Sequence, residues 1–138
     1  MTRYRWSVLV TLLLVSGARS QDSSGVSVSE LARSGASWDG TPLPAYPVQK
    51  PEITILRITI RPGSALPMHR HPVINAGVLL SGELTVVTED NKTHKLNAGD
   101  ALVEVVDKWH FGKNTGKVPA VILVFYAGAL DTPITVRK

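Results

Sequence analysis

The pattern of apolar and polar positions predicts a chain of short strands. No helical period follows residue 40, and from residue 52 onward branched and apolar residues recur in short runs between turns rich in Gly, Asn and Asp. We expect strands at 52–61, 69–80, 83–88, 93–96, 101–106, 120–126 and 134–136. The nearly all-apolar 120–126 segment is expected to be buried on both faces. Roughly seven or eight short strands at regular spacing are typical of a single all-β domain, either a barrel or a double-sheet jelly roll.

The start of the chain has the pattern of a secretory signal peptide. Residues 1–20 combine a basic start, a mostly apolar run at 6–15 that is too short to span a membrane, and the small-x-small cleavage site Ala18-Arg19-Ser20. We expect cleavage after Ser20 and export to a periplasm or to the outside of the cell. An uncleaved N-terminal anchor or a disordered tail is the alternative that the pattern leaves open.

Residues 21–51 have the composition of an N-terminal arm. The 21–40 stretch is small and polar, with a short helical turn expected at 28–34. Prolines crowd the 38–51 stretch, which argues against interior strand or helix and favours an extended path over the domain surface. The β-barrel domain is then expected at 52–138.

Composition excludes several kinds of partner. The formal net charge is +4, but the expected signal peptide carries three arginines and no acid, so the remainder has 12 Lys and Arg (15 less 3) against 11 Asp and Glu. A net charge near +1 without a basic stripe predicts no nucleic-acid partner, and no membrane partner is expected after signal cleavage. The chain has no cysteine, so its stability must come from apolar burial rather than from disulfides.

Histidine spacing indicates a metal site. His69 and His71 are two positions apart, so in an extended strand their imidazoles point to the same face and form half of a metal site. His110 is the natural candidate for the third ligand, and Asn75 has the same strand parity as the first pair. His94, in a hairpin, is expected to be a solvated surface residue.

Two motifs carry a family resemblance. The first contains Gly63, His69, His71, Asn75 and Gly82, and the second contains Gly99, His110 and Asn114. In order and spacing they resemble the two motifs of the cupin superfamily, and the chain looks like a small, secreted, type-2, quercetin-dioxygenase-like member. The resemblance implies a single-domain cupin β-barrel, also called a double-stranded β-helix or jelly roll. It also implies a homodimer, and one divalent transition metal (Fe, Zn, Ni, Mn or Cu) bound by the three histidines of the motifs.

The chain departs from the cupin pattern at Asn75, where cupins usually have a glutamate. Either the amide oxygen of Asn75 binds the metal, or a water fills the position and Asn75 hydrogen-bonds to it. Glu104 lies within an apolar run, where a charge is costly to bury unless it is paired. Facing inward it would replace the missing carboxylate as a general base or as a partner of a histidine, which makes it the candidate catalytic residue. Facing outward it would be an ordinary solvated side chain.

These observations favour an exported metal-binding cupin that acts as a metal-dependent enzyme on a small molecule, with dioxygenase-, isomerase- or lyase-like chemistry. The alternative is a non-catalytic module that binds a small ligand or a metal without turnover. A purely structural scaffold ranks last, because the histidine spacing argues against it.

Overall fold

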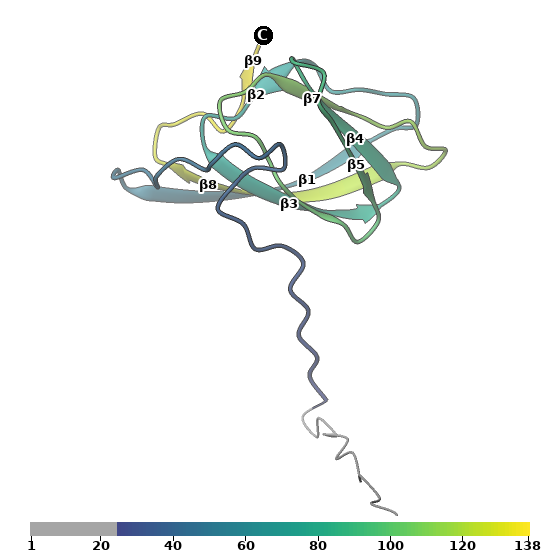
Figure 1. Cartoon of the computed structure of the whole chain (residues 1–138), viewed down its shortest axis with the longest axis horizontal. Coiled ribbons are helices and arrows are strands. Elements are labelled where there is room, and N and C mark those ends of the chain that lie inside the picture. The colour runs from purple at the N-terminus through teal and green to yellow at the C-terminus, as the bar shows by residue number, and fades with distance from the viewer. Residues whose placement is uncertain (1–24) are drawn as a thin grey trace, which may run out of the picture.

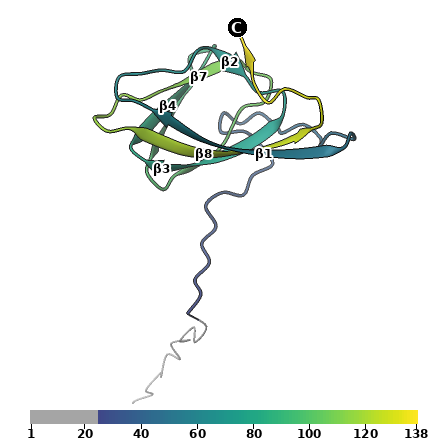
Figure 2. The same cartoon turned by 180° about the vertical axis from the view of Figure 1, so that it is seen from behind.

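The computed structural model describes residues 25–138, so the expected signal peptide at 1–20 lies outside the described residues. Within that range every regular element is a strand, and the strands form two antiparallel sheets (Figures 1 and 2). The all-β prediction is confirmed. The helical turn expected at 28–34 is wrong, because that stretch has no regular structure. Residues 25–138 also contain no apolar helix of membrane-spanning length.

Nine strands follow one another along the described chain. They are β1 (Pro51–Ile60), β2 (His69–Arg70), β3 (Ile74–Ser81), β4 (Glu83–Thr88), β5 (Thr93–Asn97), β6 (Ala101–Val103), β7 (His110–Lys113), β8 (Ala120–Ala129) and β9 (Val136–Arg137).

The strands form two layers with the core between them. One sheet has the order β1-β8-β3-β6 and the other has the order β5-β4-β7-β2-β9. Figure 1 shows the first sheet below and the second above. Apolar side chains from both sheets fill the space between the layers, among them Ile60, Leu79, Leu84, Val86, Leu96, Leu102 and Ile122. Strands far apart in sequence are neighbours, as β1 and β8 show over their whole length.

Several strands differ from the predicted ones. The segment 69–80 divides into β2 and β3, and β6 ends three residues before the predicted 106. β7 was not expected at all. The prediction that 120–126 is buried on both faces is wrong: β8 alternates, with Val124 7% exposed and Phe125 43% exposed. The reason is that β8 lies in the middle of a sheet, and no other described strand packs on the outer face of that sheet around Phe125.

The N-terminal arm contacts the barrel at several points, most of them at residues 37–39. Ala36 forms a bridge with Pro42, and the backbone N–H of Trp38 donates to the carbonyl of Val103 at 2.9 Å. Trp38 packs against the core. Residues 25–35 extend away from the barrel on the side of the β1-β8-β3-β6 sheet (Figures 1 and 2). The arm is therefore anchored mainly near the end of β6.

Two turn glycines allow a test of this packing. Gly82 and Gly99 both have positive φ angles, of 75° and 97°. A Cβ at Gly82 would lie 2.6 Å from the carbonyl oxygen of Pro119, whereas a Cβ at Gly99 would meet nothing within 4 Å. We expect Gly99→Ala to lower the free energy of unfolding by about 1 kcal/mol, from backbone strain alone. Gly82→Ala adds a steric clash and should lower it by about 2 to 4 kcal/mol. Equal losses in urea denaturation would contradict the packing at Gly82.

Candidate metal centre

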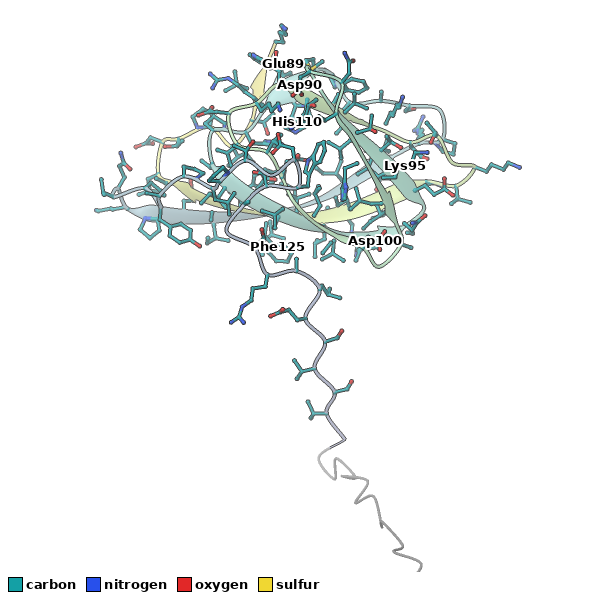
Figure 3. All side chains as sticks on the ribbon, viewed as in Figure 1. Glu89, Asp90, Lys95, Asp100, His110 and Phe125 are labelled. Carbon is teal, nitrogen blue, oxygen red and sulfur yellow. The ribbon has the colours of Figure 1, made fainter. Side chains whose placement is uncertain are left out.

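Three histidines meet inside the barrel. His69 on β2 pairs in register with His110 on β7, and His71 follows β2 two residues later on the same side. All three side chains are buried, and their ligand atoms lie within 4.8 Å of one another. Figure 3 shows His110 between the two layers. The structure thus brings together the three histidines that the spacing singled out.

Each imidazole is held by one backbone carbonyl. The Nδ1 atom of His69 lies 2.7 Å from the oxygen of Pro67, that of His71 lies 2.7 Å from the oxygen of Ile134, and that of His110 lies 2.8 Å from the oxygen of Lys108. A carbonyl oxygen can only accept, so each Nδ1 carries the proton and donates it. Each Nε2 therefore has a free lone pair, which is the state of an imidazole that binds a metal.

Burial keeps these imidazoles neutral. It lowers the pKa of His69, of His71 and of His110, and for His71 the value falls to about 4. The hydrogen bonds to the backbone carbonyls raise each pKa, but burial lowers it by more. At neutral pH the three Nε2 lone pairs are consequently available to a cation.

The donor set fits a divalent transition metal. Neutral imidazole nitrogens suit Zn, Cu, Fe and Ni, and three of them leave coordination positions open. Two nitrogens bonded to one ion at ~2.1 Å are at most about 4.2 Å apart. Small side-chain rotations would bring the three rings to that spacing, since their ligand atoms already lie within 4.8 Å.

Glu104 faces this centre, which resolves the orientation that the sequence left open. The residue is 6% exposed. Its Oε1 accepts hydrogen bonds from Nε1 of Trp38 at 2.8 Å and from the backbone N–H of Val105 at 2.9 Å. Its Oε2 lies 3.8 Å from Nε2 of His110. Burial raises the pKa of the Glu104 carboxyl, and a nearby cation would favour its charged form.

Asn75 and Tyr126 complete the polar wall of a small cavity. This cavity has a volume of about 50 Å³ and is also lined by the three histidines and Glu104. Nδ2 of Asn75 donates to the carbonyl of Val73 at 3.4 Å, a long contact. The ring of Tyr126 lies against His71, with centroids 5.2 Å apart. Burial raises the pKa of Tyr126 to about 12, so its phenol stays protonated.

A second cavity opens next to the first and contains residues that the sequence did not single out. It has a volume of about 130 Å³ and shares His69, His71 and Tyr126 with the inner one, to which it adds Thr135 and Arg137. The pairing of β2 with β9 brings Arg137 opposite His69. A larger cavity of about 450 Å³ lies between the arm and the barrel, but none of the histidines lines it. We therefore assign the chemistry to the smaller cavities.

His94 lies outside the histidine group, although the expectation that it is solvated is wrong. It is half-buried, and its ring stacks on Trp38 with centroids 5.3 Å apart. The contact joins residues 56 positions apart, so the local hairpin pattern contained no signal of it.

Comparisons with known proteins agree with this architecture. The family model described as "Cupin domain" matches residues 56–126. "Germin-like protein 8-14" from Oryza sativa subsp. japonica is 30% identical over 82 residues, which cover 55% of this chain and 38% of that protein. The chain thus spans less than half of this curated relative.

Two solved structures extend the comparison. An oxalate oxidase in complex with the substrate analogue glycolate aligns at 28% identity with a TM-score of 0.52, covering 62% of this chain and 45% of the other. The DMSP lyase DddQ from Ruegeria pomeroyi DSS-3 aligns at 22% identity with a TM-score of 0.55, covering 72% and 47%. The second likeness concerns the fold alone.

The ligand assignment predicts a contrast between two histidines. Replacing His110 by Ala removes one of the three converging nitrogens and should abolish retention of a metal ion through gel filtration. His94→Ala removes an imidazole outside the group and should leave the metal content unchanged. Elemental analysis of both variants beside the parent protein measures this. Equal metal content in the two variants would contradict the assignment.

Proposed function

The chain belongs to the cupin domain family, and from this membership and the geometry of its centre we propose that it is a metal-dependent enzyme acting on a small molecule. The metal is one divalent transition ion, held by His69, His71 and His110. The observation that carries the proposal is the matched orientation of three buried imidazoles, each with Nδ1 bonded to a carbonyl and Nε2 free. A purely structural scaffold would not require three buried imidazoles oriented in this way.

A bound Fe, Zn, Ni, Mn or Cu would supply Lewis-acid or redox chemistry at open coordination positions. The chain's own residues orient and enclose that position. Among the described residues lining the inner cavity, Glu104 is the only carboxylate, and it is the candidate catalytic residue. Asn75 lines the same cavity, where its amide oxygen is either a ligand or the hydrogen-bond acceptor of a metal-bound water.

Cavity size supports a small substrate. The inner and outer cavities, of about 50 Å³ and about 130 Å³, are well below the roughly 300–1,000 Å³ that enclose drug-sized ligands. A molecule of a few heavy atoms would fit. The aligned oxalate oxidase, at 28% identity, supports oxidative chemistry, and open coordination positions on a metal would also serve lyase- and isomerase-like reactions.

A non-catalytic module that binds a metal or a small ligand is the second candidate. It is favoured by Asn75, a neutral side chain at the position where cupins usually have a glutamate. For cellular location, the residue pattern of 1–20 supports export to a periplasm or to the exterior.

A second copy of the chain is the proposed protein partner. The outer face of the β1-β8-β3-β6 sheet is mainly apolar, with Ile53 64% exposed, Ile55 53% exposed and Phe125 43% exposed. β1 is an edge strand, and Phe125 lies on the outside of the layers in Figure 3. Four strands of up to ten residues present roughly 500–600 Å², near the ~800 Å² per partner of a standard interface. Two such faces related by a two-fold axis would cover each other.

The enzyme proposal is tested with untagged protein from residue 21 onward. We expect about one Fe, Cu, Ni, Mn or Zn per chain after expression without added metal. We also expect turnover, as oxygen consumption with small acids for Fe or Cu, or as elimination or isomerisation for the others. Bound metal without any turnover across such panels would favour the binding module. No metal uptake, even after reconstitution, would refute the metal-dependent enzyme and leave only a module that binds a small ligand without metal.

The homodimer is tested by placing a charge on the apolar face. The parent chain should sediment as a dimer at micromolar concentration, and Phe125→Lys should shift it to a monomer because the lysine would be buried unpaired. Val118→Lys is the matched control, because Val118 is exposed in a turn outside the strands of this face. A monomeric parent chain, or a dimeric Phe125→Lys variant, would refute this interface.

A further inference from the structure

Cupins usually have a glutamate at the position of Asn75, and in this chain a carboxylate lies next to that position, at Glu104 beyond the end of the neighbouring strand β6. β3 and β6 pair with Ala76 opposite Val103, and the backbone N–H of Glu104 continues the ladder by donating to the carbonyl of Asn75 at 3.0 Å. Residues opposite each other on neighbouring strands point to the same face, with Cβ atoms about 5 Å apart. Both side chains line the inner cavity. Glu104 thus occupies the place beside Asn75 on the same wall of the site.

The carboxylate is held asymmetrically. Within residues 25–138, both hydrogen bonds that it accepts go to Oε1, from Trp38 and from the backbone of Val105. Oε2 is turned to the histidines and lies 3.8 Å from Nε2 of His110. Oε1 is therefore fixed by its two hydrogen bonds, while Oε2 faces the Nε2 atom of His110, whose lone pair is available to a metal.

We propose that Oε2 of Glu104 is the anionic ligand of the metal held by the three histidines, and that Trp38 positions it. The inference rests on the metal centre proposed above. Two atoms bonded to one ion at ~2.0–2.2 Å are at most about 4.3 Å apart, and the observed 3.8 Å lies inside that limit. An unpaired carboxylate is costly to bury, and a divalent cation beside it offsets that cost.

Trp38 reaches this position because the arm is fastened on both sides of Glu104. The N–H of Trp38 donates to the carbonyl of Val103 at 2.9 Å, and Oγ of Ser37 donates to the carbonyl of Glu104 at 2.9 Å. The indole also stacks on His94. The arm thus fixes both the backbone and the side chain of Glu104, so a segment outside the barrel strands positions a group of the centre.

The test compares Glu104→Gln with Glu83→Gln. Gln keeps the size and the acceptor for Trp38 but removes the charge. Glu83 is exposed and lies on β4 five residues from Thr88, which pairs with His110, so its replacement removes the same charge far from the centre. Chelator competition gives the affinity for Zn²⁺, and the visible spectrum of Co²⁺-substituted protein reports which atoms coordinate.

We expect Glu104→Gln to weaken Zn²⁺ binding at least about 10-fold and to change the energy and intensity of the Co²⁺ bands, while Glu83→Gln changes neither. Equal affinity in Glu104→Gln and the parent, or a weaker affinity with an unchanged Co²⁺ spectrum, would refute direct ligation and leave the three-histidine centre standing. Failure of the parent itself to bind either metal would refute the centre and this inference together.

Trp38→Phe tests the positioning role without altering any ligand. It keeps an aromatic ring but removes the Nε1–H donor to Oε1. We expect a loss of roughly 10-fold in Zn²⁺ affinity and a shift of the Co²⁺ bands. In the Glu104→Gln background the same replacement should have little further effect, because Trp38 acts through the carboxylate. Full additivity of the two losses would refute the positioning role.

Discussion

Three hydrogen bonds from imidazole Nδ1 atoms to backbone carbonyls are the constraint on which the centre depends. The accepting carbonyls belong to three different segments: the turn before β2, the segment before β7, and the C-terminal segment before β9. Each bond selects the tautomer with a free Nε2 and limits ring rotation. The carbonyls are in place only when β2 pairs with both β7 and β9. The fold therefore determines the charge state and the direction of each Nε2 atom of the proposed metal centre.

The centre also joins the two layers. His69 and His110 belong to the sheet that contains β2 and β7, whereas Asn75, Glu104 and Tyr126 lie on or next to strands of the other sheet. An ion bound between them would cross-link the layers in a chain that has no disulfide. Metal binding would then contribute to folding stability, since the unfolded chain has no preformed site. The N-terminal arm adds a third contact by holding Glu104 from outside the barrel.

Sequence predicted those features of the centre that depend on residues close together along the chain, and it missed those that depend on distant ones. Period-two spacing correctly brought His69 and His71 together: His69 lies on β2, His71 follows the end of that strand, and both line the same cavity. It did not determine the direction of Glu104, since β6 ends at Val103 and both Glu104 and Val105 are buried beyond it. The alternation continues to Glu104, whose backbone N–H extends the β6 ladder, and breaks only at Val105.

Other features depend on contacts between distant parts of the chain, which local patterns do not encode. β7 is short and mixed in composition and becomes a strand through pairing with β4 and β2. Trp38 finds Glu104 across 66 positions. The exposed outer face of β8 reflects its place in the sheet rather than its own apolar sequence.

The most direct test of the account is proton NMR of the Co²⁺-loaded protein in water and in deuterium oxide. If three imidazoles bind through Nε2 while each Nδ1–H donates to a carbonyl, three strongly shifted resonances should appear in water and vanish in deuterium oxide, one per ring. Fewer than three such signals with cobalt fully bound would contradict the three-imidazole centre, and with it the link from the barrel's strand pairing to its chemistry.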